Sequence, residues 1–142
     1  MKTFKYWMVI PTALAMILTS VGVARTQTIQ LTPEFKPDPL VVTGTSGGSQ
    51  TNKGCGMIGA APNHVITLND NFNYLRFSVQ SDNQPTLLIQ GPSGSSCVQA
   101  DNLSGGKIEA PGLWEKGSYS LYIGDRAGGQ HPYTLSITRT RN

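Results

Sequence analysis

A serine set among glycines is the first arrangement of residues in this chain that points to chemistry. Residues 44–48 (GTSGG) match the G-x-S-x-G pattern in which the serine is a nucleophile. That chemistry needs a sharp turn from a strand into a helix, which raises the serine hydroxyl above the helix N-terminus. Residues 44–48 instead follow a proline-rich stretch and lead into polar residues. Because Gly/Ser-rich segments produce such matches through composition alone, we interpret Ser46 as part of a linker.

Two histidines and several carboxylates are the remaining candidates for acid–base catalysis. The histidines are His64 and His131, and the acids are Asp82, Asp101, Asp125, Glu109 and Glu115. None of them falls in a spacing that marks a known site, and the separation of paired carboxylates is a property of the fold. A small secreted hydrolase, or a subunit associated with one, is therefore an alternative. It predicts a concave site in which a histidine meets a carboxylate within hydrogen-bonding distance.

Three aromatic side chains are candidates for contacting a ligand. Alternation along the predicted strands turns Tyr122 outward, Tyr74 begins a strand, and Trp114 lies in a turn. Planar side chains exposed on a sheet can stack on sugar rings or contact a protein partner. A lone tryptophan beside a turn also commonly covers the edge of a core, so the sequence leaves both roles open for Trp114.

Cys55 and Cys97 are the two cysteines of the chain. An even number of cysteines in an exported chain favours a disulfide. Closing a loop of about 42 residues stabilises a fold by about 4 kcal/mol in the chain-entropy model. A redox or metal-binding role is disfavoured, because the C-x-x-C spacing that such sites commonly use does not occur.

The first 24 residues have the pattern of a signal peptide. Lys2 and Lys5 precede an apolar run over 7–23, which ends at small residues suited to signal peptidase. The run is at the short limit for a membrane span, so cleavage is favoured over an uncleaved anchor. We predict export to the periplasm, the cell envelope or the medium, with no further membrane span in the exported chain.

The charge of the chain does not favour a nucleic-acid partner. The formal net charge of +3 includes Lys2 and Lys5 of the predicted signal, so the exported chain is close to neutral. The one basic cluster is Arg139 and Arg141, whereas binding to nucleic acid needs basic residues gathered over a whole face. We therefore expect no nucleic-acid partner.

The exported sequence changes character near residue 55. Residues 25–54 contain three prolines and a Gly/Ser-rich run, which we interpret as a flexible N-terminal tether. Over 55–142 apolar and polar residues alternate, which is the period of a β-strand. The clearest runs are 74–80, 119–123 and 133–138, and weaker ones are 65–68, 86–90, 96–99 and 107–110. About seven short strands separated by turn residues predict an all-β fold, an antiparallel β-sandwich.

Residues 64–140 resemble the bacterial pre-peptidase C-terminal domain. The resemblance rests on the GPSG turn at 91–94, the GSY opening at 117–119 and the YTLSI run at 133–137. It implies a jelly-roll-like sandwich that accompanies secreted proteases and other exported enzymes as an accessory or binding module. Some relatives bind collagen or polysaccharide, and some bind calcium.

The chain departs from that family in two respects. No catalytic domain accompanies the predicted sandwich, so the resemblance implies no protease activity. The run 86–88 (TLL) replaces the acidic opening usual in the family, and the loop aspartates are spread over separate predicted turns: Asp70, Asp82, Asp101 and Asp125. Because calcium needs six to eight converging oxygens, we expect no cofactor and keep calcium as an alternative.

Together these patterns predict a free-standing, exported sandwich that binds a protein or a polysaccharide at the cell envelope and has no catalytic activity. A purely structural envelope protein is a further alternative. It predicts neither a pocket nor a cluster of outward aromatic residues. The sequence leaves the ligand and the oligomeric state open.

Overall fold

The computed structural model describes residues 26–52, 54–101 and 103–141. The predicted signal peptide, 1–24, lies outside these residues. Within them the chain forms β1 (Gln27–Leu31), β2 (Leu40–Thr45), β3 (Gln50–Asn52), β4 (Gly56–Ile58), β5 (His64–Leu68), β6 (Phe72–Ser81), β7 (Pro85–Gly91), β8 (Gly94–Gln99), β9 (Lys107–Trp114), β10 (Gly117–Asp125) and β11 (Pro132–Thr138). The described part of the chain contains no helix with the length and hydropathy of a membrane span.

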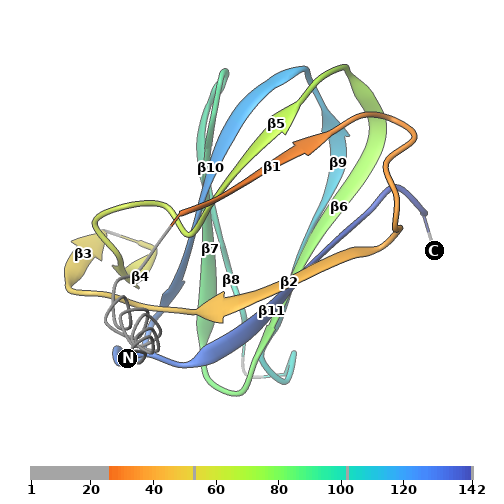
Figure 1. Ribbon diagram of the computed structural model, residues 1–142. Coiled ribbons are helices and arrows are strands. Elements are labelled where there is room, and N and C mark those ends of the chain that lie inside the picture. The colour runs from red at the N-terminus through yellow and green to blue at the C-terminus, as the bar shows by residue number, and fades with distance from the viewer. Residues whose placement is uncertain (1–25, 53, 102, 142) are drawn as a thin grey trace, which may run out of the picture.

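The strands form two sheets that pack face to face as the layers of a sandwich (Figure 1). In the larger sheet, which we call sheet A, β10 pairs with β5 and β4 along one edge and with β7 along the other. β1 adds to β5, β3 to β4, and β8 to β7. The smaller sheet B has the order β2-β11-β6-β9. The described strands therefore form the all-β sandwich that the sequence predicts, with mainly antiparallel pairing.

A period-two pattern turns one apolar face of each sheet toward the core. In β6 the side chains of Leu75, Phe77 and Val79 are fully buried, and the residues between them are less buried. β10 and β11 repeat the pattern over 119–123 and 133–138. The three clearest predicted strands are thus confirmed.

The described chain contains eleven strands, more than the seven or so that the sequence predicts. The weaker predicted strands, 65–68, 86–90, 96–99 and 107–110, fall in β5, β7, β8 and β9. The four additional strands, β1 to β4, all lie in the N-terminal part of the domain.

The prediction of a flexible tether over 25–54 is wrong, because this segment contributes strands to both sheets. β1 pairs in parallel with β5, and β2 pairs antiparallel with β11. Leu31 is 1% exposed, and Phe35 in the following connection is also buried. The prolines that suggested a tether lie in the connection between β1 and β2, where they do not interrupt pairing. The domain therefore begins near Gln27 rather than at residue 55.

Cys55 and Cys97 form the predicted disulfide, with their Cα atoms 5.8 Å apart. The bond joins the turn before β4 to β8, which is an edge strand of sheet A. Cys55 is buried with Ile58 and Leu88 in a small cluster separate from the main core, and Tyr122 packs on this cluster. The disulfide thus fastens an edge strand whose sheet pairing comes from β7 alone among the described strands.

We expect Leu31→Ala to lower the free energy of unfolding by about 2–5 kcal/mol, because it leaves a cavity in the core. The matched control is Val41→Ala in β2, whose side chain is 52% exposed. There the change should stay below about 1 kcal/mol. Urea denaturation followed by circular dichroism measures both effects. Equal, small effects in the two variants would contradict the place of β1 in the core.

Replacing both cysteines by serine should lower the free energy of unfolding by up to about 4 kcal/mol. The loss should also concentrate at β8, because the disulfide fastens this edge strand. Hydrogen exchange of the native protein measures it: amides of β8 should lose protection well before those of β6. Unchanged protection in β8 would show that β7 alone holds the strand.

Candidate functional site

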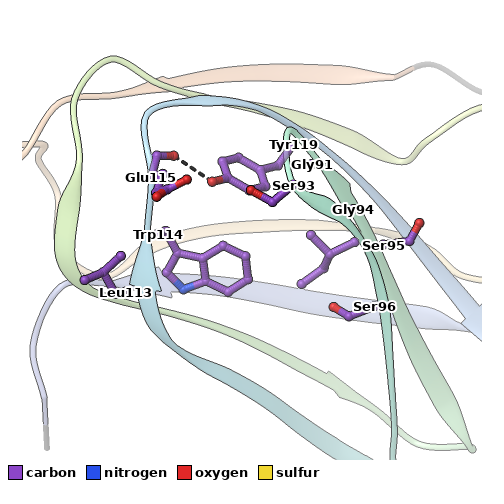
Figure 2. A pocket seen from close by; sticks show the side chains of 10 residues that line it. Gly91, Ser93, Gly94, Ser95, Ser96, Leu113, Trp114, Glu115 and Tyr119 are labelled. Carbon is purple, nitrogen blue, oxygen red and sulfur yellow. Dashed lines mark hydrogen bonds between the residues drawn. The ribbon is translucent and has the colours of Figure 1, made fainter.

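A cleft of about 430 Å³ opens where β8 and β9, edge strands of the two sheets, come together (Figure 2). Its volume falls within the roughly 300–1,000 Å³ that is usual for ligand sites. The apolar part of its lining consists of Ile89, Leu113 and Trp114. Gly91, residues 93–96, Glu115 and Tyr119 complete the lining. We call this site the Trp114 cleft.

Trp114, the last residue of β9, is the aromatic residue that sets the shape of the cleft. Its indole N–H donates to the carbonyl oxygen of Leu75 over 3.0 Å. The indole ring meets Phe77 and Tyr119 edge to face, with ring centroids 4.9 and 5.4 Å apart. The side chain is half-buried. Trp114 therefore covers the edge of the core, as one of its two predicted roles requires, and also lines the cleft.

Two glycines allow the chain to close around the cleft. Gly91 ends β7 so close to Tyr119 that a Cβ atom there would lie 2.5 Å from the phenol ring. Gly117 begins β10 with φ at 146°, and a Cβ atom there would lie 2.6 Å from Pro92. Glycine has no Cβ and accepts positive φ, so it suits both positions. The 91–94 turn consequently rests on the start of β10 and places the serines of β8 at the cleft.

The polar side chains of the cleft are available to a ligand. Ser93, Ser95 and Ser96 are exposed, and their hydroxyls make no hydrogen bond to another described side chain. Glu115 is also exposed, and its backbone oxygen accepts a 2.6 Å hydrogen bond from the hydroxyl of Tyr119. Burial and then the charge of Glu115 raise the pKa of Tyr119, against the effect of that hydrogen bond. Tyr119 is thus a neutral donor at physiological pH, and Glu115 supplies the negative charge of the cleft.

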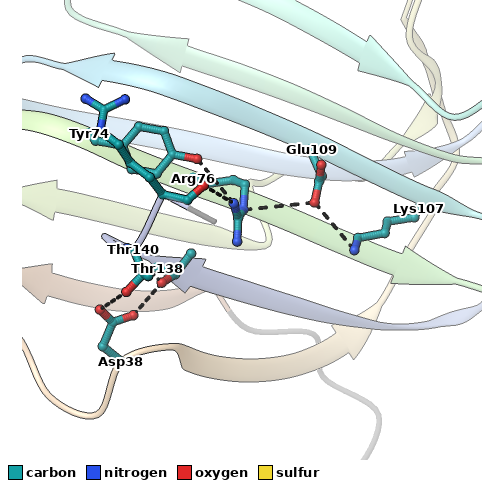
Figure 3. Close-up of polar contacts among 8 residues, drawn as sticks. Asp38, Tyr74, Arg76, Lys107, Glu109, Thr138 and Thr140 are labelled. Atoms are coloured by element: carbon teal, nitrogen blue, oxygen red, sulfur yellow. Dashed lines mark hydrogen bonds and ion pairs between the residues drawn. The ribbon is translucent and has the colours of Figure 1, made fainter.

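The three aromatic residues predicted to contact a ligand lie apart in the structure. Tyr122 packs on the disulfide cluster at the outer face of sheet A. Tyr74 lies at the outer face of sheet B, where Arg76 donates to its hydroxyl over 3.2 Å (Figure 3). The guanidinium of Arg141 lies 4.6 Å from the centre of the Tyr74 ring. Of the three, Trp114 lines the cleft. Ligand contact by Tyr74 and Tyr122 is untested.

The sequence did not single out the serines of β8 as members of a site. A local signal for them exists, because β8 (GSSCVQ) is polar on both faces and follows a tight turn. Such a strand is typical of a sheet edge that is open to solvent. Leu113, which also lines the cleft, is 66% exposed in the structure, and the sequence alone does not indicate this exposure.

His131 and Asp125 form the histidine–carboxylate contact that the hydrolase alternative predicts. Nδ1 of His131 lies 3.1 Å from Oδ2 of Asp125, a fully buried residue. Nε2 of His131 lies 2.7 Å from the side-chain amide nitrogen of Asn83. Because an amide nitrogen donates, Nε2 accepts this hydrogen bond and Nδ1 carries the proton. Nδ1 is close to Asp125 but makes no aligned hydrogen bond with it. None of the three side chains lines the Trp114 cleft.

Ser46, the serine of the G-x-S-x-G match, is fully buried beside this network. Its backbone N–H donates to the carbonyl oxygen of His131 over 2.7 Å. Ser46 is the first residue after β2, and the described chain continues into β3 without a helix. Ser46 thus lies at a packed strand end, which corrects its interpretation as part of a linker and differs from the strand-to-helix turn of a nucleophile.

The loop aspartates form turns, as aspartates commonly do. Oδ1 of Asp70, of Asp101 and of Asp125 each accepts a backbone N–H from one or two residues downstream, over 2.8–2.9 Å. Over the described ranges, no group of three or more His, Cys, Asp or Glu side chains is arranged to hold a metal ion. Calcium binding stays untested.

His64 is a buried titratable group that fastens the two sheets together. It is 1% exposed, and its Nε2 shares a 2.7 Å hydrogen bond with the hydroxyl of Tyr133. Burial lowers the pKa of His64 to about 4. Burial also raises the pKa of Tyr133 to about 12, against the effect of a hydrogen bond from Asn63. Both groups are consequently neutral at physiological pH, which suits a polar contact between β5 and β11 inside the sandwich.

A solved structure defines the class of fold. The pre-peptidase C-terminal domain of collagenase from Bacillus anthracis matches 82% of this chain and 97% of that domain, with a TM-score of 0.53 and 21% sequence identity. The chain therefore has the fold of a pre-peptidase C-terminal domain, which confirms the resemblance in the sequence. A periplasmic inhibitor of g-type lysozyme from Aeromonas hydrophila matches 80% of this chain and 98% of that protein, with a TM-score of 0.45 and 13% identity.

A sequence relative defines the family. No family model matches the chain. The uncharacterized protein Synpcc7942_2126 of Synechococcus elongatus is 39% identical over 103 residues, which cover 70% of this chain and 75% of that protein. The chain belongs to the family of this cyanobacterial protein.

We expect the protein to lose stability as the pH falls from about 6.5 to about 4, because of His64. The pKa of His64 is lower in the folded chain than in the unfolded chain, so the unfolded chain binds the extra proton in this range. The stabilisation is complete above pH 6.5 and falls by up to about 3 kcal/mol toward pH 4. His64→Gln removes the titrating group and keeps an amide that can reach Tyr133.

Urea denaturation at pH 7, 6, 5 and 4 measures this slope in both proteins. The variant should be less stable than wild type at pH 7 and should show a flatter dependence on pH. Parallel curves for the two proteins would contradict the role of His64, since carboxylates common to both would then account for the whole slope.

Proposed function

We propose that this protein is an exported, non-catalytic binding module, which recognises a protein or a polysaccharide at the cell envelope through the Trp114 cleft. The observation that carries the proposal is the composition of that cleft. An aromatic ring held by Leu75, Phe77 and Tyr119 lies beside exposed hydroxyls and a carboxylate. A rigid aromatic anchor with a few convergent polar groups is the usual composition of a recognition site.

The proposal of a non-catalytic role is supported by the positions of the two histidines. Nε2 of His131 accepts a hydrogen bond from Asn83, and Nδ1 lies 3.1 Å from the buried carboxylate of Asp125. His64 is buried against Tyr133, with a pKa of about 4. A general base must reach the proton that it removes, and neither histidine lines the Trp114 cleft.

The proposal of export is supported by the disulfide and by the predicted signal peptide over 1–24. Disulfides form and persist outside the reducing cytosol, in the periplasm or the medium. The bond between Cys55 and Cys97 is therefore compatible with the compartment that the N-terminal sequence predicts.

The hydrolase alternative is favoured by one observation, the contact of His131 with Asp125. A substrate would have to displace Asn83 to reach Nε2 of His131. Hydrolysis of ester, peptide or glycoside substrates that disappears in His131→Ala, but persists in Trp114→Ala, would establish this alternative. The purely structural alternative predicts no pocket, so the Trp114 cleft disfavours it.

Binding to isolated envelope proteins and polysaccharides tests the proposal. We expect a ligand whose affinity falls at least tenfold in Trp114→Ala, because the substitution removes the anchor of the cleft. Leu113→Ser should weaken binding severalfold and leave stability nearly unchanged, since this side chain is 66% exposed. Melting curves establish that each variant is folded.

Matched controls lie on the outer face of sheet B. Tyr74→Ala removes an aromatic residue from that face, and Val41→Ser removes an exposed aliphatic one. Both controls should bind like the wild type. Binding that survives both cleft substitutions, or that is lost in Tyr74→Ala instead, would contradict the assignment of the site.

A further inference from the structure

The indole of Trp114 is presented to the cleft as a fixed apolar surface. Its N–H donor is already used by the carbonyl oxygen of Leu75, 3.0 Å away. Edge-to-face contacts with Phe77 and Tyr119 restrict the ring from the side of the core. Figure 2 shows the ring nearly face-on within the opening. A ligand can therefore gain stacking on the ring without a hydrogen bond to the indole nitrogen, and the ring loses little freedom on binding.

Hydroxyl groups are the main polar partners that the cleft offers. Ser93, Ser95 and Ser96 come from the turn after β7 and from β8, and all three are exposed. A serine hydroxyl both donates and accepts, as does each hydroxyl of a sugar. Peptide groups have a fixed direction, because N–H only donates and C=O only accepts. Ser95 and Ser96 alternate across β8, and Figure 2 shows Ser96 on the side of Trp114 and Ser95 on the opposite side. The adaptable hydroxyls of Ser93 and Ser96 near one aromatic ring therefore match a polyhydroxylated ring better than they match a peptide.

The charge of the cleft further restricts the class of ligand that it can bind. Glu115 is the one formally charged side chain among the lining residues, and Lys116, the next residue, does not line the cleft. A carboxylate accepts hydrogen bonds from neighbouring sugar hydroxyls and makes them stronger than neutral ones. It repels uronate, sulfate and phosphate groups at the same short distance. The cleft is thus suited to an uncharged sugar.

The exposure of the lining residues indicates a polymer. Leu113 and the serines of β8 are open to solvent, and the cleft lies at the side of the sandwich between two edge strands. A chain of sugars can therefore continue past the cleft on its solvent-exposed side.

We infer that the Trp114 cleft binds an uncharged polysaccharide, with one sugar ring stacked on Trp114 and its hydroxyls bound by Ser93, Ser96 and Glu115. This inference rests on the proposed function and specifies its ligand. The competing occupant is an extended peptide, which would pair with the free edge of β8 and use the cleft for one side chain.

Titration with defined oligosaccharides tests the inference. The probes are hexamers of β-1,4-glucose, β-1,4-mannose and N-acetylglucosamine, with oligogalacturonate and alginate oligomers as anionic counterparts. Trp114 is the sole tryptophan of residues 25–142, since Trp7 belongs to the predicted signal peptide. Fluorescence excited at 295 nm therefore reports on the cleft directly. At least one neutral hexamer should change the emission with saturation, and the anionic oligomers should not.

Two substitutions on the exposed side of the cleft avoid the risk that Trp114→Ala fails to fold. The double variant Ser93→Ala/Ser96→Ala should weaken binding of the neutral hexamer about 5–20-fold, and Glu115→Gln about 3–10-fold. Glu115→Lys should likewise weaken binding of the neutral hexamer, and it should permit binding of oligogalacturonate. The matched control is Ser49→Ala, an exposed serine that does not line the Trp114 cleft, which should bind like the wild type.

The outcomes separate this inference from the proposed function. Tighter binding of anionic than of neutral oligomers, or neutral binding that is unchanged in the double variant, overturns the inference. If an envelope protein or peptide binds through Trp114 and no oligosaccharide binds, the inference is overturned and the proposed function stands. If no ligand binds through the cleft, both the inference and the proposed function are overturned.

Discussion

The burial of the apolar face of sheet A against the apolar face of sheet B is the constraint on which the rest of the structure depends. Phe77 and Leu121 are fully buried between the sheets. Since side chains alternate along a strand, a slip of one residue would expose a whole apolar set, and this fixes the register of both sheets. Trp114 packs on Phe77 and Tyr119, so the aromatic residue of the cleft is an extension of the core. Packing against the core of the sandwich therefore holds the cleft rigid.

Polar contacts hold the periphery of the sandwich in place without occupying the cleft. Asp38, in the connection between β1 and β2, accepts hydrogen bonds of 2.6 and 3.3 Å from the hydroxyls of Thr138 and Thr140 (Figure 3). His131 accepts a hydrogen bond from Asn83 and lies 3.1 Å from a carboxylate oxygen of Asp125. These polar groups contact partners within the fold, whereas the serines of β8 do not have such partners among the described side chains. The difference distinguishes polar groups that stabilise the fold from polar groups that can meet a ligand.

The sequence predicts best those elements whose burial repeats every second residue. β6, β10 and β11 were found in this way, and two cysteines sufficed to predict the disulfide. β1 and β2 were missed because these edge strands bury few side chains, and the prolines and glycines around them give a stronger local signal than Leu31 does. The cleft was predicted only through Trp114. Its serines lie on another sheet, and which two edges meet across the sandwich is a tertiary property that local patterns do not specify.

The most direct test of the account is to map a bound ligand on the chain by NMR. The indole N–H of Trp114 gives one resonance in residues 25–142, and the amides of 93–96 and of Glu115 surround it. The account predicts that a neutral oligosaccharide shifts these resonances together and leaves those around Tyr74 and Arg76 unchanged. Shifts concentrated on the outer face of sheet B, with the indole resonance unmoved, would contradict it.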